Sequence, residues 1–270
     1  MPGQVQQLVK WTAAAADALR RPRGLVVLIY HRVGGHTPVS VDLPRPLFAE
    51  QLAALTAGWA PVTLDAAAGL LAGPAAPPGP PPVCLTFDDG TADFVEDALP
   101  ELVAQGIPVT LYVATDFIEA GREFPDNGRP MSWAGLRDGL STGLVTIGSH
   151  THTHRLLDRV DGPEAAGELD RSIGLIEDRL GVACAHFAYP KALLGSPAAE
   201  QEVRSRFRTA VVARTRPNPY GRTDLHRISR SPVQVGDGMR WFRRKAAGGM
   251  ALEDDLRVLR NRRRYAETVT

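Results

Sequence analysis

Short apolar runs alternate with amphipathic segments along most of the chain. Each apolar run is bounded by proline, glycine or polar residues, which is typical of a buried strand. The clearest helical spacing lies over 163–180, where proline stands at the start and Gly181 follows the end. The pattern predicts strands over 25–30, 61–64, 83–87, 108–114, 144–147, 186–189, 209–213 and 225–228. It predicts helices over 5–19, 46–57, 92–105, 133–140, 163–180, 198–206, 239–247 and 252–265.

The alternation of strands and helices predicts an α/β fold, with a parallel sheet or barrel and helices outside it. In such folds the catalytic groups gather at the carboxyl ends of the strands. The side chains that stand at or just beyond a predicted strand end are Asp88, Asp89, His150, His154 and Tyr189. We therefore expect them to gather at the same end of the sheet or barrel.

The net charge and the cysteine content limit which binding partners and which cellular compartment we expect for this protein. The formal net charge of 31 − 30 = +1 gives no reason to expect nucleic acid or an anionic membrane as a partner. Cys84 and Cys184 both lie in apolar runs, so we expect buried free thiols rather than a disulfide. No apolar stretch is long enough to span a bilayer, and the N-terminus lacks a signal-peptide pattern. The expected location is cytoplasmic, and the sequence does not determine the oligomeric state.

Two sequence motifs place candidate metal ligands at the ends of predicted strands. Asp88 and Asp89 are neighbouring carboxylates, which are compatible if one binds a cation while the other stays free to accept a proton. His150 and His154 are four residues apart, so one helical turn would place both imidazoles on one face. Two histidines and one aspartate form a three-ligand site with open positions, which suits a hydrolytic metal. For His152 we favour a surface or adventitious role.

The segments 86–90 (Thr-Phe-Asp-Asp-Gly) and 150–154 (His-Thr-His-Thr-His) resemble the first two motifs of the polysaccharide deacetylases, which are carbohydrate esterase family 4 with its NodB-homology domain. Their order and spacing also match that family. The segments 30–33 (Tyr-His-Arg-Val) and 187–190 (Phe-Ala-Tyr-Pro) resemble the branch that begins with a Tyr-His strand. The resemblance covers residues 25 to 235, and it implies a distorted (β/α) barrel of about seven parallel strands.

The resemblance also implies a reaction and a set of roles. Asp88 would be the general base, and Asp89, His150 and His154 would hold a divalent metal. Zinc is the metal we expect, with Co²⁺, Ni²⁺, Mn²⁺ or Fe²⁺ as alternatives. The implied reaction is hydrolysis of an N-acetyl or O-acetyl group on a saccharide by metal-activated water.

By the same resemblance, the oxyanion donor comes from the segment 189–191. The backbone N–H of Lys191 is the expected donor, and Tyr189 is expected beside the substrate. Family members usually have Tyr-Gly after the proline, where this chain has Lys191 and Ala192.

The chain also departs from the family pattern in its third and fourth motifs. Ala188 stands where the family often has an arginine that orients the base, and the chain shows no Asp/Trp stretch like the fourth motif. We hypothesise that Arg227 holds Asp88 instead. His226 is the candidate acid that protonates the leaving amine. His31, at the end of the first strand, is expected to face the site.

The 270 residues and a hydrophobic content of 44% predict a packed core. We predict an N-terminal helix within 1–24, a deacetylase barrel domain over 25–235 and a helical tail over 236–270 that packs on the barrel. The proline-rich segment 72–82 should be extended and exposed. We interpret it as a surface crossing within the barrel domain.

The leading hypothesis is a metal-dependent deacetylase that acts on an acetylated sugar or oligosaccharide. One alternative keeps the fold and the metal but hydrolyses a non-sugar amide or a cyclic imide. Another is a catalytically silent glycan-binding protein, which the altered third motif favours and the intact Asp88 argues against. A two-histidine, one-carboxylate iron oxygenase is disfavoured, because Asp89 lies far upstream of the histidines.

Overall fold

Seven parallel strands close into a barrel in the computed structural model, which describes residues 11–12 and 24–251. The ring runs in the order β1 (Val26–Tyr30), β10 (Ile228–Pro232), β9 (Thr209–Ala213), β8 (His186–Ala188), β7 (Val145–Ser149), β6 (Val109–Val113) and β5 (Pro82–Phe87). Parallel pairing between β5 and β1 completes the closure. The predicted barrel of about seven parallel strands is therefore confirmed.

Three shorter strands lie beside the ring. β4 (Ala60–Pro61) pairs with the first two residues of β5, on the edge that β6 occupies further along. β2 (Arg32–Val33) follows β1 and pairs in parallel with β3 (Asp42–Leu43). This small sheet starts just beyond the carboxyl end of β1, so it stands at the end of the barrel where catalytic groups are expected.

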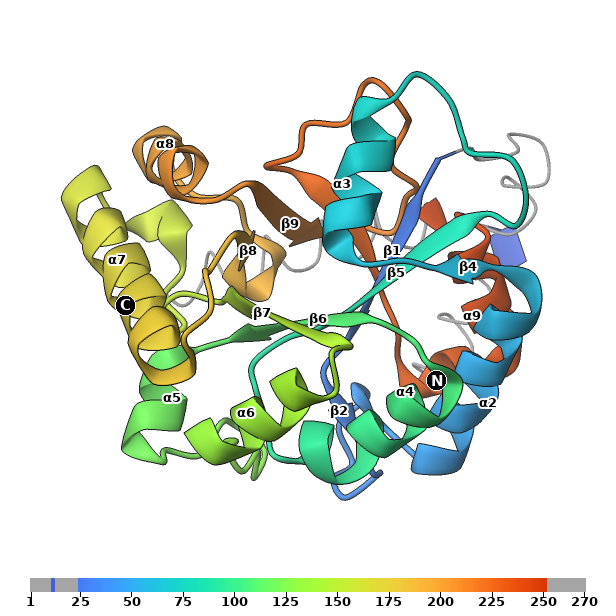
Figure 1. Ribbon diagram of the computed structural model, residues 1–270, viewed down its shortest axis with the longest axis horizontal. Coiled ribbons are helices and arrows are strands. Elements are labelled where there is room, and N and C mark those ends of the chain that lie inside the picture. The colour runs from blue at the N-terminus through green and yellow to red at the C-terminus, as the bar shows by residue number, and fades with distance from the viewer. Residues whose placement is uncertain (1–10, 13–23, 252–270) are drawn as a thin grey trace.

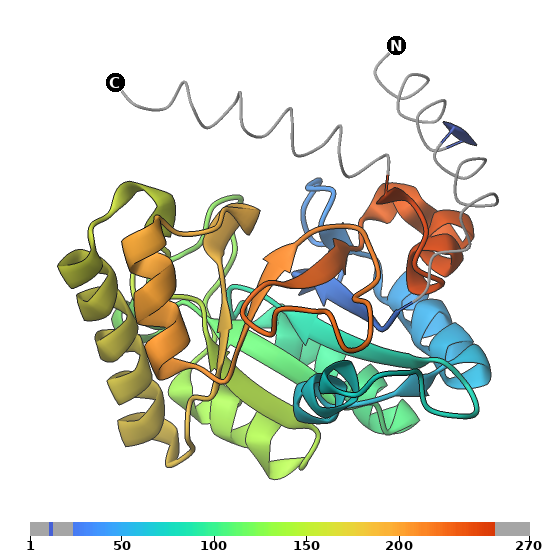
Figure 2. The ribbon, with the colours of Figure 1, turned by 90° about the horizontal axis from the view of Figure 1, so that it is seen from above.

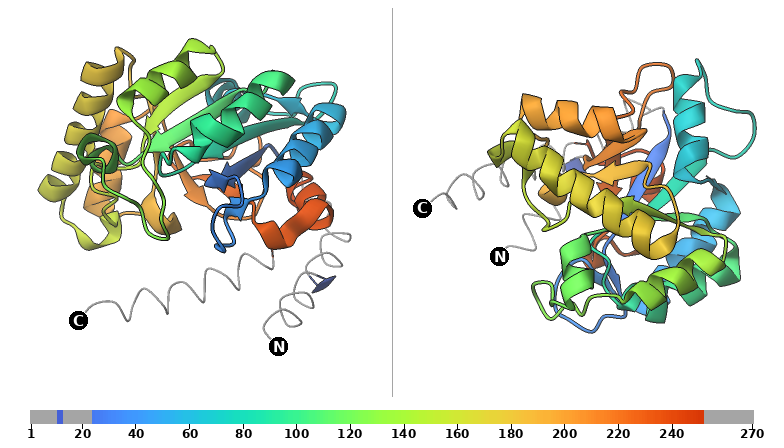
Figure 3. Two further views of the ribbon diagram at one scale, coloured as in Figure 1. Left: turned by 90° about the horizontal axis from the view of Figure 1, so that it is seen from below. Right: turned by 60° about the vertical axis from the view of Figure 1, so that its left-hand side comes forward.

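Helices surround the barrel and pack as neighbouring pairs. Their bounds are α2 (Arg45–Gly58), α3 (Leu64–Ala72), the π-helix η1 (Phe94–Ala98), α4 (Leu99–Gln105), α5 (Thr115–Ala120), α6 (Trp133–Ser141), η2 (Leu157–Arg159), α7 (Gly162–Leu180), η3 (Pro190–Ala192), α8 (Pro197–Arg206), η4 (Val235–Asp237) and α9 (Gly238–Ala246). α2 contacts α9, α7 contacts α8, and the two pairs lie on opposite sides of the barrel (Figures 1 and 2). α4 and α6 run along one further side (Figure 3).

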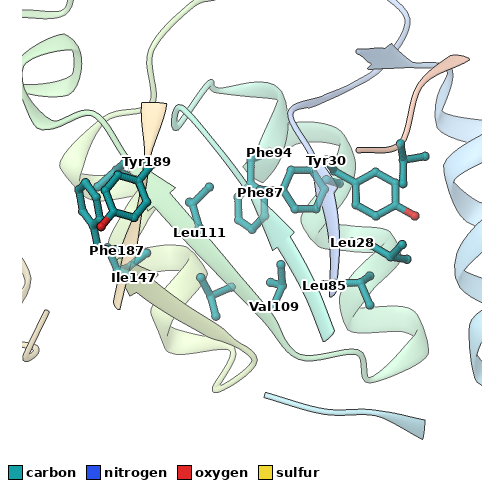
Figure 4. Packing of buried hydrophobic residues seen from close by; sticks show 14 of the residues in the cluster. Leu28, Tyr30, Leu85, Phe87, Phe94, Val109, Leu111, Ile147, Phe187 and Tyr189 are labelled. Carbon is teal, nitrogen blue, oxygen red and sulfur yellow. The ribbon is translucent and has the colours of Figure 1, made fainter. Parts of the chain in front are cut away.

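Alternating strand residues divide the core into two layers. The outer layer lies between strands and helices, and Figure 4 shows part of it, including Leu85, Phe87, Leu111, Phe187 and Tyr189. These side chains are almost fully excluded from solvent, so the outer layer provides the larger share of apolar burial.

The inner layer fills the barrel itself. Val27, Cys84 and Tyr112 belong to this cluster, and α3 contributes Leu64 and Leu71 to it. α3 thus covers the amino end of the barrel, which leaves the carboxyl end for polar groups. The proline-rich segment connects α3 directly to β5, as expected of a crossing within one barrel.

The clearest predicted helix is confirmed as α7. Asp161 accepts a hydrogen bond from the Glu164 N–H at 2.9 Å, and Gly181 ends the helix with φ of 69°. The helix predicted over 92–105 is divided into η1 and α4, and α5 was not predicted. The strand predicted over 225–228 is wrong, because β10 begins only at Ile228.

The predicted helices over 5–19 and 252–265 fall outside the described residues, apart from residues 11 and 12. The helix predicted over 239–247 is found as α9, which packs on α2 and β1. The domain boundaries at 24/25 and 235/236 stay a prediction. Cys84 and Cys184 are buried and free, as expected. Within 24–251, no helix has both the length and the apolar character needed to cross a bilayer.

Close packing inside the barrel makes Gly148 of β7 sensitive to substitution. A Cβ there would lie 2.6 Å from Tyr112 Cδ1 and 2.8 Å from the His186 carbonyl oxygen. We expect Gly148→Ala to lower the free energy of unfolding by about 1–3 kcal/mol, because neither neighbour can move freely. Urea denaturation measures the change.

Gly167→Ala in α7 is the matched control, since a Cβ there meets nothing within 4 Å. It should stabilise the protein by about 0.5–1 kcal/mol through helix propensity. Equal stability of the two variants would contradict this description of the barrel interior.

Candidate metal centre

Polar side chains from four strands meet at the carboxyl end of the barrel. Asp88 and Asp89 follow β5, His31 follows β1, and His150 follows β7. Arg230 comes from within β10, at 1% exposure. The parallel arrangement brings Arg230 to Asp88, although the two residues are 142 positions apart in the chain.

The turn that carries the two aspartates is fixed to both neighbouring strands. The Asp88 N–H donates to the Tyr30 carbonyl at 3.1 Å, and the Asp89 carbonyl accepts from the Ala114 N–H at 3.1 Å. Asp89 has φ of 74° and Gly90 has φ of 95°, which is the sharp turn expected after this strand. This sharp turn lets the two neighbouring carboxylates contact different partners.

The two histidines meet through a turn, not through a helix. Thr151 and His154 have φ of 63° and 62°, so the predicted helical turn over 150–154 is wrong. Glu168 of α7 holds the turn by accepting hydrogen bonds from the backbone N–H groups of His152 at 3.1 Å and Thr153 at 2.8 Å. The rings of His150 and His154 then lie 4.9 Å apart.

Asp89, His150 and His154 form a compact donor set. Asp89 Oδ1 lies 3.7 Å from His150 Nε2 and 3.5 Å from His154 Nε2, and the ligand atoms of all three lie within 4.8 Å of one another. His152 lies apart from this set, with its Nδ1 2.9 Å from Thr115 Oγ1. The predicted ligands are thus brought together, and His152 is left out as expected.

The protonation states of the donor set suit a divalent cation. His150 Nδ1 lies 2.8 Å from the Ala188 carbonyl, which can only accept, so Nδ1 carries the proton and Nε2 is free to bind. Burial lowers the pKa of His154 to about 3, assisted by His150 and opposed by Asp89. Burial would raise the pKa of Asp89, but His154 and His31 outweigh it and lower this pKa to about 2. An ionised Asp89 carboxylate, a neutral His154 imidazole and the Nε2 atom of His150 fit zinc or a similar ion.

Arg230 is the partner of the predicted base. Its Nη1 and Nη2 donate to Asp88 Oδ1 and Oδ2 at 2.6 and 2.8 Å, and Nη1 also contacts Thr86 Oγ1 at 2.9 Å. The guanidinium lies 5.1 Å from the centre of the Tyr112 ring. Burial would raise the pKa of Asp88, but the charge and hydrogen bonds of Arg230, assisted by His150, hold it below its usual value.

The hypothesis that Arg227 holds Asp88 is therefore wrong. Arg227 precedes β10, at the amino end of the barrel, and its Nη2 donates to Glu200 Oε2 at 2.5 Å. The error follows from the misplaced last strand. With β10 at its true position, alternation from Ile228 directs Arg230 into the barrel, and this signal was hidden by the polar sequence Ser-Arg-Ser.

Two further predicted site residues lie elsewhere. His226 also precedes β10, and its Nε2 is 2.8 Å from the Phe207 carbonyl, so the structure contradicts its assignment as the acid. Tyr189 follows β8, but its ring packs 5.0 Å from the Phe187 ring in the outer layer (Figure 4). The Tyr189 side chain therefore does not face the donor set.

Lys191 and His31 do lie at the site. Both line a cleft of about 350 Å³ together with Asp89 and His154. Lys191 has φ of 54°, and its charge contributes to the lowered pKa of Asp89. Burial lowers the pKa of His31 against the opposing charges of Asp89 and Asp88. His31 Nδ1 is buried without a hydrogen-bond partner in the described part of the chain.

Comparisons with known proteins agree with this geometry. The polysaccharide deacetylase family model matches residues 75–206, which include both motifs. No curated protein matches the chain. IcaB from Ammonifex degensii is 28% identical with a TM-score of 0.70, and the match covers 83% of this chain and 97% of that one.

Two further structures share the fold at lower identity. The deacetylase PplD from Streptococcus pyogenes, in complex with acetate, has a TM-score of 0.72 at 18% identity, covering 83% of this chain and 99% of that chain. The BpsB deacetylase domain from Bordetella bronchiseptica has a TM-score of 0.63 at 24% identity, covering 77% and 95%. The matched motifs, the barrel and the family model together show that residues 75–206 of the chain are similar to the polysaccharide deacetylases.

Proposed function

We propose that the protein is a metal-dependent deacetylase that hydrolyses an N-acetyl or O-acetyl group on a saccharide. The observation that carries the proposal is an ion-paired Asp88 next to the donor set of Asp89, His150 and His154. The match of residues 75–206 to the polysaccharide deacetylase family model supports sugar deacetylation as the reaction class. The structure adds a base candidate and a candidate metal site on the same end of one barrel.

Asp88 would accept a proton from the attacking water. Its two oxygens each receive one hydrogen bond from Arg230, and each retains a second lone pair for that proton. Because Arg230 favours the ionised form, Asp88 is a weak base that cannot ionise ordinary water easily. A divalent ion, with zinc expected, would supply the missing acidity by lowering the pKa of water and by polarising the acetyl carbonyl.

The same ion pair would favour the return of the proton. Once Asp88 is protonated, the neighbouring Arg230 disfavours the neutral carboxyl, so transfer to the leaving nitrogen or oxygen is promoted as the bond to the acetyl carbon breaks. The backbone N–H of Lys191 is the proposed donor to the developing oxyanion, since Lys191 lines the cleft beside Asp89 and His154.

Acetate release tests the reaction directly. Zinc-loaded protein should release acetate from at least one member of a panel of N-acetylated oligosaccharides. Chelation of the metal and Asp88→Asn should each reduce the rate by about 10²-fold or more, because each removes the activation of water. No release from any saccharide, with one metal bound per chain, would instead favour a non-sugar amide, a cyclic imide or a binding protein.

The metal site can be tested without activity. His154→Ala should lose most of the bound zinc after dialysis, because one of the three ligands is removed. His152→Ala should retain it, since this histidine lies outside the donor set. Elemental analysis gives the zinc content, and the zinc-dependent rise in melting temperature should follow the same order. Equal zinc retention in both variants would contradict the assignment of His154.

Arg230 should act as the positioning residue of the base. Arg230→Lys keeps the charge but loses the two-pronged contact, so kcat should fall about tenfold with little change in KM. Arg230→Met should lose more activity, and stability too, because Asp88 is then buried without a partner.

Arg227→Met is the matched control on the same segment. Its pair with Glu200 lies at the surface, so kcat and KM should stay close to the wild-type values. A loss of kcat in Arg227→Met equal to that in Arg230→Lys would contradict the role given to Arg230.

A further inference from the structure

One wall of the catalytic cleft is a tight turn over 124–128. Phe124, Pro125 and Asp126 line the cleft together with Asp89 and His154. The turn is closed by two reciprocal backbone hydrogen bonds between Phe124 and Gly128, at 2.8 and 3.2 Å. Its first half therefore contributes directly to the space that a substrate would fill.

The backbone of this turn is one that ordinary residues seldom adopt. Asp126 and Asn127 both have positive φ, 57° and 56°, although neither is glycine. Asparagine and aspartate tolerate this region better than most residues, but two in succession need support from elsewhere in the structure. The turn is also exposed at Pro125, Asp126 and Asn127, so apolar burial supports its start at Phe124 but not the two residues with positive φ.

Arg32 provides it. Its side chain is largely buried, and Nη1 and Nη2 donate to the carbonyl oxygens of Asp126 at 2.7 Å and Pro125 at 2.6 Å. These bonds are shorter than the usual N–H···O distance, as charge-assisted bonds are. A Cβ at Gly128 would lie 2.1 Å from Arg32 Nη2, so the turn and the guanidinium fit together closely.

Arg32 also stands between the cleft and a second polar hollow. It lines both the cleft and a hollow of about 290 Å³, which Asn127, Gly128 and Arg129 also line. β2 fixes its backbone, since the Arg32 N–H donates to the Val41 carbonyl at 3.2 Å. A shift of the guanidinium would therefore move a wall shared by both spaces.

We propose that Arg32 is a positioning residue that holds the 124–128 turn as the saccharide-contacting wall of the cleft. The inference rests on the proposed deacetylase function. The clamp acts on the backbone carbonyls of the wall, whereas Asp88 is held separately by Arg230. Arg32 therefore sets the affinity for the sugar part of the substrate and leaves the attack on the acetyl group unchanged.

The test compares two substrates that share the acetyl group. One is an N-acetylated oligosaccharide. The other is a small aryl acetate, which is too small to contact the 124–128 turn while its acetyl group is at the metal site. In Arg32→Met, KM for the oligosaccharide should rise about tenfold, equivalent to about 1.4 kcal/mol, while kcat/KM for the aryl acetate stays within about twofold. Arg32→Lys should recover part of the affinity, since it keeps one donor to the carbonyls.

Arg129→Met is the matched control. Arg129 lies beside the turn, but its side chain pairs with Glu96 at the surface and does not line the cleft. Its kinetics should match the wild type with both substrates. Equal losses with both substrates in Arg32→Met, or no change with either, would overturn the proposal.

Hydrogen exchange separates this inference from the proposed function. In Arg32→Met, the Gly128 amide should exchange faster while the amides of β5 and β6 keep their protection. Should zinc-loaded wild type release acetate from neither substrate, the deacetylase proposal fails, and unchanged exchange at Gly128 would then refute the clamp as well. If Arg32→Met does not fold, Gly128→Ala provides the same comparison, because its methyl group displaces the guanidinium without removing the charge.

Discussion

The buried ion pair between Arg230 and Asp88 is the interaction on which the arrangement of this barrel depends. A carboxylate at 5% exposure cannot stay ionised without a close positive partner, and Arg230 supplies it from the opposite end of the chain. Thr86 accepts from Arg230 and donates to the Leu28 carbonyl at 2.8 Å, so the pair is tied into two adjacent strands. The interior is thus divided into a polar carboxyl end and an apolar amino end that α3 covers.

The same pair explains how the chain tolerates Ala188 in the third motif. The arginine expected near that position is replaced by one from β10, which reaches Asp88 from a different strand. The backbone of Ala188 keeps a role, because its carbonyl fixes the tautomer of His150. A small side chain at this position does not interfere with that contact, since only the carbonyl takes part.

The strands and the donor set were predictable because their signals are local. Apolar runs followed by Asp88-Asp89 and by His150 mark strand ends, and parallel topology then gathers them. The missed features depend on distant partners. β10 reads Ile-Ser-Arg-Ser-Pro, so its burial becomes evident only when Asp88 is seen opposite Arg230. The positive φ values in the 150–154 turn depend on Glu168 of α7, which the spacing of the histidines does not reveal.

The polar sequence of β10 has a consequence for how the ring closes. Before β10 docks, β1 and β9 each have an unpaired edge, and Asp88 is a charged group without a partner inside an apolar wall. β10 has few apolar side chains to bury, so the ion pair between Arg230 and Asp88 is the interaction that favours its docking between β1 and β9. Closure of the ring and pairing of Asp88 with Arg230 are then one cooperative event, so the last strand to enter the barrel is also the one that completes its polar end.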